Sequence, residues 1–256
     1  GDIVNCLNMV DKATEKKYKL DSNRQVEELR NTLLVYNGQN PDYEYIDSVL
    51  IDAGAGGGGV STYADVLLNN WKDKYGKEHR GLIDAENELY STYLKRYPDA
   101  INKLRLISPR KYRTQMVEEF IELMNLGVLR LPYEYGGQDF LKIKNGIDPV
   151  SGEEIFTSYD LSDDEKMALV NLDLMKVEIA NIHKLTNAEK TSVVYALSKE
   201  KENRMHDDRF YVAIMLAHRL YELRRGAVIK KPRQSSDDPI LFAFRKPELY
   251  KNRRWN

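Results

Sequence analysis

The chain has very little cysteine and almost no net charge. Its 256 residues contain one cysteine, Cys6, which excludes a disulfide framework and a cysteine-rich zinc site and favours a reducing compartment. Lysine and arginine total 39 and aspartate and glutamate total 40, which excludes a histone-like protein held to DNA by its overall charge. Any contact with nucleic acid must therefore be local.

Two sequence patterns are also missing. The apolar runs are shorter than the roughly 20 residues needed to cross a bilayer, so we expect a soluble, cytoplasmic protein with no membrane partner. Neither Gly-Lys-Ser nor Gly-Lys-Thr occurs, which excludes a P-loop ATPase motor within these residues. The remaining composition, 42% hydrophobic and 31% charged, is ordinary for a folded globular domain.

The first half of the chain is predicted to be α/β. A strand, a crossover helix and a second strand in this order are typical of a parallel sheet with helices packed on its faces. The residue patterns predict, in chain order, strands over 3–10 and 18–20 that form a hairpin, a helix over 24–35, a strand over 45–51, a helix from Ser61 or Thr62 to about Gly76, and a strand over 81–83.

The second half is predicted to contain two long helices and a second hairpin. Its predicted elements are a helix over 112–126, a strand over 128–131, a hairpin of two strands within 177–197, and a helix over 207–225. The segment 219–256 holds 11 basic and 4 acidic residues, so it is the one clearly basic region. Such a segment either lies on phosphates or is a solvated terminus.

Asp52 is the first candidate functional residue. It ends the predicted strand over 45–51, and five of the six residues from Gly54 to Gly59 are glycine. A carboxylate at a strand end can be held rigidly in a cleft, and glycines let a phosphate approach the backbone closely. The simpler alternative is that Asp52 begins a turn.

Asp207 and Asp208 form the second candidate, next to His206 and directly before an apolar helix. An aspartate at a helix N-terminus satisfies free backbone N–H groups and interacts favourably with the helix dipole. Capping explains one aspartate fully, but it explains two consecutive ones less well. A hard divalent cation would use the second carboxylate.

A dinucleotide site is an alternative interpretation of the glycine-rich segment. Gly54, Gly56 and Gly59 match the Gly-x-Gly-x-x-Gly spacing between a strand and a helix, and Asp84 ends the next strand, where a ribose hydroxyl is bound. That interpretation predicts an oxidoreductase. Asp52 argues against it, because its negative charge would lie close to the pyrophosphate.

Three segments, in this order, resemble the nuclease domain of the large terminase subunit of tailed double-stranded DNA bacteriophages. They are Asp52 with its glycine loop, Leu104 to Pro109 leading into the helix at Tyr112, and the helix start His206-Asp207-Asp208-Arg209. The resemblance implies a ribonuclease-H-like fold, with a mixed sheet flanked by helices and an accessory β-hairpin. It also implies a metal-dependent endonuclease, with two Mg²⁺ or Mn²⁺ ions, that cuts concatemeric phage DNA during genome packaging.

The resemblance covers nearly the whole chain and assigns roles to its segments. Residues 1–225 correspond to the nuclease domain, with an accessory insertion at about 146–205, and residues 226–256 to a basic C-terminal tail. The implied partners are double-stranded DNA, the portal protein, the small terminase subunit and an ATPase domain N-terminal to this one in the same polypeptide. The implied location is the host cytoplasm. A further alternative is a non-catalytic module whose basic tail docks on DNA or a capsid protein.

By the same resemblance, Asp52 corresponds to the second catalytic carboxylate and Asp207 and Asp208 to the third, all of them metal ligands. The first should stand on a strand before the N-terminal hairpin, where Asp2 is the nearest acid. We therefore expect a fragment cut inside that strand. The alternative assignment makes Asp52 the first carboxylate and Asp84 or Glu86 the second.

Overall fold

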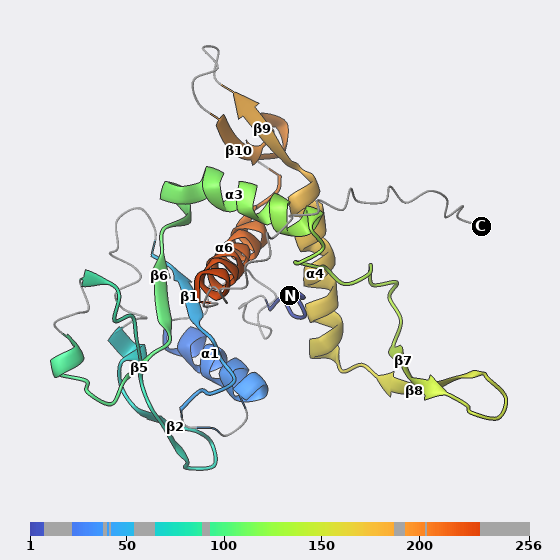
Figure 1. Ribbon diagram of the computed structural model, residues 1–256, viewed down its shortest axis with the longest axis horizontal. Coiled ribbons are helices and arrows are strands. Elements are labelled where there is room, and N and C mark those ends of the chain that lie inside the picture. The colour runs from blue at the N-terminus through green and yellow to red at the C-terminus, as the bar shows by residue number, and fades with distance from the viewer. Residues whose placement is uncertain are drawn as a thin grey trace, which may run out of the picture.

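The computed structural model describes residues 1–7, 22–37, 40, 42–53, 65–88, 93–186, 193–202 and 204–230, and these form a mixed α/β protein (Figure 1). The elements are α1 (Ser22–Asn37), β1 (Val49–Asp52), β2 (Trp71–Lys72), β3 (Glu78–His79), β4 (Leu82–Ile83), η2 (Tyr93–Lys95), β5 (Ile101–Asn102), β6 (Leu104–Ile107), α3 (Pro109–Asn125), β7 (Phe140–Ile147), β8 (Glu154–Asp160), α4 (Asp163–Ala180), β9 (Ile182–Thr186), β10 (Val193–Leu197), α5 (Lys199–Glu202) and α6 (Asp208–Lys230).

The described strands pair in twos, where the sequence predicted one mixed sheet. β1 pairs with β6 and β4 with β5 in parallel, whereas β2–β3, β7–β8 and β9–β10 are antiparallel. Parallel pairing of β1 is therefore confirmed, but its predicted partner is wrong: β1 lies beside β6, and the strand over 81–83 pairs with β5. The β7–β8 hairpin projects away from the rest of the protein in Figure 1.

The β1–β6 pair separates two hydrophobic cores, because side chains on a strand alternate between its two faces. One face contributes Val49 and Leu104 to the N-terminal core, and the other contributes Ile107 to the C-terminal core. The buried residues of the N-terminal core are Val26, Leu33, Tyr43, Val49, Leu67, Leu68, Leu82, Ile83 and Leu104. Those of the C-terminal core are Ile3, Met116, Val117, Phe120, Leu123, Leu129, Leu172, Met175, Tyr195, Phe210, Ala213, Ile214 and Ala217.

Helices α3 and α6 make up much of the C-terminal core. α3 begins at Pro109, whose fixed φ and missing N–H suit the first helical position. Phe120 of α3 meets Phe210 of α6 edge to face, with 6.2 Å between the ring centroids. Full burial of each such side chain contributes about 1.5–3 kcal/mol. This packing holds the beginning of α6 against α3.

Several predicted helices and strands are confirmed with small shifts of their ends. α1 contains the predicted helix over 24–35, and α3 begins three residues earlier than expected. β9 and β10 form the predicted second hairpin, but its first strand was placed too early, because residues 177–180 belong to α4. α6 continues to Lys230, past the predicted boundary of the basic tail.

Other predicted elements are wrong. Trp71 is not on a helix but in β2, which pairs with β3 across a turn where Gly76 adopts a φ of 79°. Residues 3–7 are not in a strand, and the segment 128–131 contributes only an isolated parallel bridge between Asp2 and Arg130. The second strand of the N-terminal hairpin, the glycine segment 54–59 and the tail beyond residue 230 lie outside the described residues.

In the part of the chain that the structure describes, no helix combines the length and the apolar character that crossing a membrane requires.

Candidate functional site

Asp52 is the last residue of β1, at the carboxyl end of the parallel pair. Its register partner on β6 is Ile107, and the backbone N–H of Ala53 continues the ladder by donating to the Ile107 carbonyl at 2.6 Å. Register partners in a parallel pair share a face, and Ile107 packs against the C-terminal core. Asp52 therefore lies on the face toward α6, with an exposed side chain.

Asp207 precedes α6 directly, and its backbone carbonyl accepts the first helical hydrogen bond from the N–H of Tyr211, at 3.0 Å. A capping aspartate would use its carboxylate to accept a backbone N–H of the first turn. Glu178 of α4 takes that role instead, because its Oε2 accepts the N–H of Phe210 at 2.9 Å. The Asp207 carboxylate is therefore not used as a helix cap.

The carboxylate of Asp207 faces Arg113 of α3. Arg113 Nη2 donates to Asp207 Oδ2 at 2.7 Å, and its Nη1 donates to the hydroxyl of Tyr211. The guanidinium also stacks over the Tyr211 ring, with 4.6 Å between its Cζ and the ring centroid. Asp208, by contrast, is exposed at the first position of α6.

Two of the candidate acids, Asp207 and Asp52, both influence the pKa of Tyr211. Burial raises the pKa of Tyr211, Arg113 opposes that rise, and the negative charges of Asp207 and Asp52 add to it. Both carboxylates therefore lie within electrostatic reach of the same phenol, although they are far apart in sequence. Ile107, the register partner of Asp52, and Tyr211 also pack against the same core.

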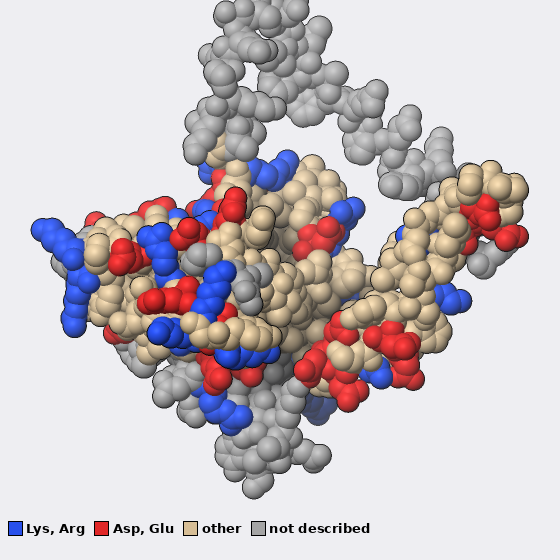
Figure 2. Space-filling model, turned by 90° about the horizontal axis from the view of Figure 1, so that it is seen from below, with Lys and Arg blue, Asp and Glu red and all other residues tan. Residues whose placement is uncertain are grey.

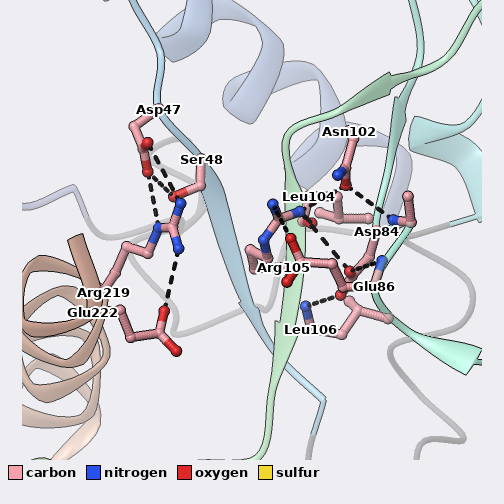
Figure 3. Close-up of polar contacts among 11 residues, drawn as sticks. Asp47, Ser48, Asp84, Glu86, Asn102, Leu104, Arg105, Leu106, Arg219 and Glu222 are labelled. Carbon is pink, nitrogen blue, oxygen red and sulfur yellow. Dashed lines mark hydrogen bonds and ion pairs between the residues drawn. The ribbon is translucent and has the colours of Figure 1, made fainter. Parts of the chain in front are cut away.

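Asp84 and Glu86, the alternative carboxylates, have other partners (Figure 3). Asp84 is buried, and its two oxygens accept the backbone N–H groups of Leu106, at 2.8 Å, and Glu86, at 3.2 Å. Glu86 forms an ion pair with Arg105 at 3.0 Å. Asp84 therefore fastens the end of β4 to β6, which accounts for its position without a metal or a ribose.

A cleft of about 380 Å³ lies beside these residues, between β6, the beginning of α3 and the middle of α6. Arg219 borders it and is held by Asp47 at 2.9 Å and by Glu222 at 3.2 Å, as Figure 3 shows. His218 Nδ1 is 2.6 Å from Glu119 Oε2, so this histidine is hydrogen-bonded to α3. The cleft thus contains both charge signs, mostly paired with each other.

Asp2 is not brought to this site. Its carboxylate accepts from Arg130 Nε at 2.7 Å and from Nη2 at 3.1 Å, and the hydrogen bonds from Arg130 lower the pKa of Asp2. Arg130 follows the C-terminal end of α3, whereas Asp52 is level with Ile107, two residues before the N-terminal end. A helix of 17 residues spans about 25 Å, so Asp2 and Asp52 lie at opposite ends of α3.

Arg113, Tyr211 and Glu178 are site residues that the sequence analysis did not identify. One signal was present: Arg110, Lys111 and Arg113 all lie in the first five residues of α3, and the first turn has no acidic residue. Positive charge is unfavourable beside a helix N-terminus, so three such residues there indicate nearby anions. No sequence pattern connects Glu178 with α6.

The described residues contain no group of three or more histidine, cysteine, aspartate or glutamate side chains that could hold a metal. Mg²⁺ is often bound through only one or two carboxylates, with water and substrate phosphate oxygens completing its octahedron. Asp52 and Asp207 offer two carboxylates of that type. A divalent cation held jointly by the protein and a phosphate would use carboxylates of this type.

Charge is mixed on one face of the protein. On the face that Figure 2 shows, lysine and arginine side chains are interspersed with aspartate and glutamate. This distribution agrees with the near-zero net charge of the sequence. Binding of DNA would have to depend on individual basic residues close to the site, such as those at the start of α3.

Comparison of the chain with protein-family models, with curated proteins and with solved structures finds no match.

Proposed function

We propose that the chain is a divalent-metal-dependent endonuclease of the large-terminase type, which cuts concatemeric double-stranded phage DNA during genome packaging. The observation that supports it most is the position of the two carboxylates: Asp52 ends β1 on the face toward α6, Asp207 lies at the start of α6, and both act on the pKa of Tyr211. The order of the three resembling segments along the chain also agrees with it. We propose that the complete fold is ribonuclease-H-like, with the parallel β1–β6 pair in its central sheet and the neighbouring α6 as one of the flanking helices.

In this proposal Asp52 and Asp207 bind and orient Mg²⁺ or Mn²⁺, and Asp208 is the neighbouring carboxylate. When bound, the metal ions lower the pKa of an attacking water and stabilise the leaving 3′ oxygen of the phosphodiester. Asp207 is favoured over Asp208 as the inner ligand, because it faces Arg113 and Tyr211 while Asp208 is exposed.

The beginning of α3 is proposed to hold the DNA backbone. Arg110 and Lys111 lie in its first turn, and the free N–H groups of a helix N-terminus also favour an anion. The near-zero net charge then keeps binding weak until the DNA is delivered. The N-terminal ATPase domain, the portal protein and the small terminase subunit are the partners that the proposal implies.

Plasmid nicking tests this function. Wild-type protein, Asp52→Asn and Asp207→Asn are incubated with supercoiled plasmid in Mn²⁺, with EDTA added to parallel samples. Asp163→Asn is the matched control, because Asp163 is fully exposed at the start of α4. We expect metal-dependent nicking that falls more than about 100-fold in both site variants, beyond the usual loss from an outer-shell substitution. The control should nick like wild type.

The same experiment separates the candidates at the start of α6. If Asp208→Asn loses nicking and Asp207→Asn keeps it, Asp208 is the ligand and the assignment above is wrong. If folded wild-type protein neither binds Mn²⁺ nor nicks plasmid, the nuclease proposal itself fails.

A further inference from the structure

We propose that Arg113 is the resting counter-ion of Asp207, that a divalent cation displaces it from this carboxylate, and that the released guanidinium then binds a DNA phosphate. The inference rests on the proposed function and adds a regulatory contact to the same site. It assigns a role to a residue that lies neither on the strand of Asp52 nor on α6.

The ion pair between Arg113 and Asp207 is partly shielded from water. Their side chains are 19% and 25% exposed, so the charge of Asp207 needs compensation in the absence of a metal. One Nη contacts one carboxylate oxygen, at 2.7 Å, and the second Nη is directed to Tyr211. The pair therefore lacks the bidentate geometry that makes arginine–carboxylate contacts strongest, and a cation of higher charge can compete for it.

Tyr211 keeps the guanidinium in place when Asp207 is taken by a metal. Its hydroxyl accepts from Arg113, and its ring lies under the guanidinium at 4.6 Å. Stacking of this kind is attractive by itself and does not depend on Asp207. Arg113 would therefore stay beside the metal after it has given up the carboxylate.

Arg113 also has an unused donor. Within the described structure its Nε is buried and has no hydrogen-bond partner. A buried N–H without an acceptor is costly, so an oxygen acceptor beyond those of the described residues would stabilise this guanidinium. A phosphate oxygen is a suitable acceptor, because the planar guanidinium matches phosphate geometry and Arg110 and Lys111 lie on the same first turns of α3.

Mn²⁺ binding in the absence of DNA tests the competition. Free Mn²⁺ is measured by electron paramagnetic resonance for wild type, Arg113→Gln and Arg113→Lys, with Arg130→Gln as a control that removes an arginine–aspartate pair at the other end of α3. We expect Arg113→Gln to bind Mn²⁺ at least about tenfold more tightly than wild type, because the substitution removes a positive charge that competes with the cation for Asp207 and repels it. Arg113→Lys should lie between them, and Arg130→Gln should match wild type.

The second half of the proposal is tested with DNA. At saturating Mn²⁺, Arg113→Gln should nick plasmid more slowly than wild type and require more DNA for half-maximal rate, and Arg113→Lys should recover part of the loss. Arg113→Gln that binds Mn²⁺ no more tightly than wild type contradicts the proposal. If thermal unfolding shows that Arg113→Gln does not fold, the same comparison is decided with Arg113→Lys.

The Asp207→Asn variant distinguishes the two levels of the account. If it loses Mn²⁺ binding while Arg113→Gln gains none, the nuclease function stands and the counter-ion inference fails. If Asp207→Asn and wild type bind Mn²⁺ equally, the proposed metal site fails.

Discussion

At the scale of single residues, the structure shows carboxylates in very different roles that the sequence could not separate. Asp84 is a structural acceptor, Asp2 belongs to an exposed ion pair, and Asp207 faces a guanidinium beside the candidate site. In the sequence all three are acids near the ends of predicted elements. Their roles depend on which donors long-range packing brings to them, and no local spacing encodes that.

Asp73 gives a prediction about pH. Hydrogen bonding from His79 holds the pKa of Asp73 below its ordinary value of 3.8, burial opposes this, and the N–H groups of Lys77 and Tyr75 add to the lowering. A lowered pKa stabilises the fold above the unfolded-state value, and that stabilisation is lost as the pH falls through the folded-state value. We expect wild type to be more stable than Asp73→Asn near neutral pH, with the difference shrinking below about pH 4.

Urea unfolding of both proteins at a series of pH values measures that difference. A difference in the free energy of unfolding that stays constant or widens in acid would show that the Asp73 carboxylate does not stabilise the β2–β3 turn.

At the scale of elements, regular helices were predictable and their partners were not. Apolar residues at helical spacing located α1, α3 and α6 to within a few residues, because each helix buries one face. Trp71 fits the same spacing but belongs to β2, where its ring stacks on His79 at 4.6 Å and its Nε1 donates to Tyr43. Tertiary contacts of this kind override local spacing.

The α4–α6 contact gives a prediction at this scale. Glu178 is 3% exposed, accepts the N–H of Phe210, and is paired with Arg209 at 2.7 Å, so it replaces the cap that Asp207 does not provide. Glu178→Gln keeps the size of the side chain and removes its charge. We expect a loss of about 1–3 kcal/mol in the free energy of unfolding.

Chemical denaturation measures this loss, and Glu118→Gln on the exposed face of α3 serves as control, with an expected change within about 0.5 kcal/mol. Equal stabilities for the two variants would mean that α6 begins at Asp208 without help from α4.

At the scale of the whole molecule, the β1–β6 pair determines where the site can be. It lies between the two cores, and its carboxyl end places Asp52 toward α6. The sequence predicted the strand, the acid at its end and the helix that begins at the paired aspartates. It did not predict that β6 would be the neighbour of β1, because that pairing joins segments more than 50 residues apart.

The central claim is that Asp52 and Asp207 bind one divalent cation together. A crystal structure of the protein in Mn²⁺, with the metal located by its anomalous scattering, tests it most directly. We predict a peak bound by carboxylate oxygens of both Asp52 and Asp207, with Arg113 moved off Asp207 and still stacked on Tyr211. An Asp52 carboxylate out of bridging range, with no metal beside it and Arg113 still paired with Asp207 at saturating Mn²⁺, would contradict the account.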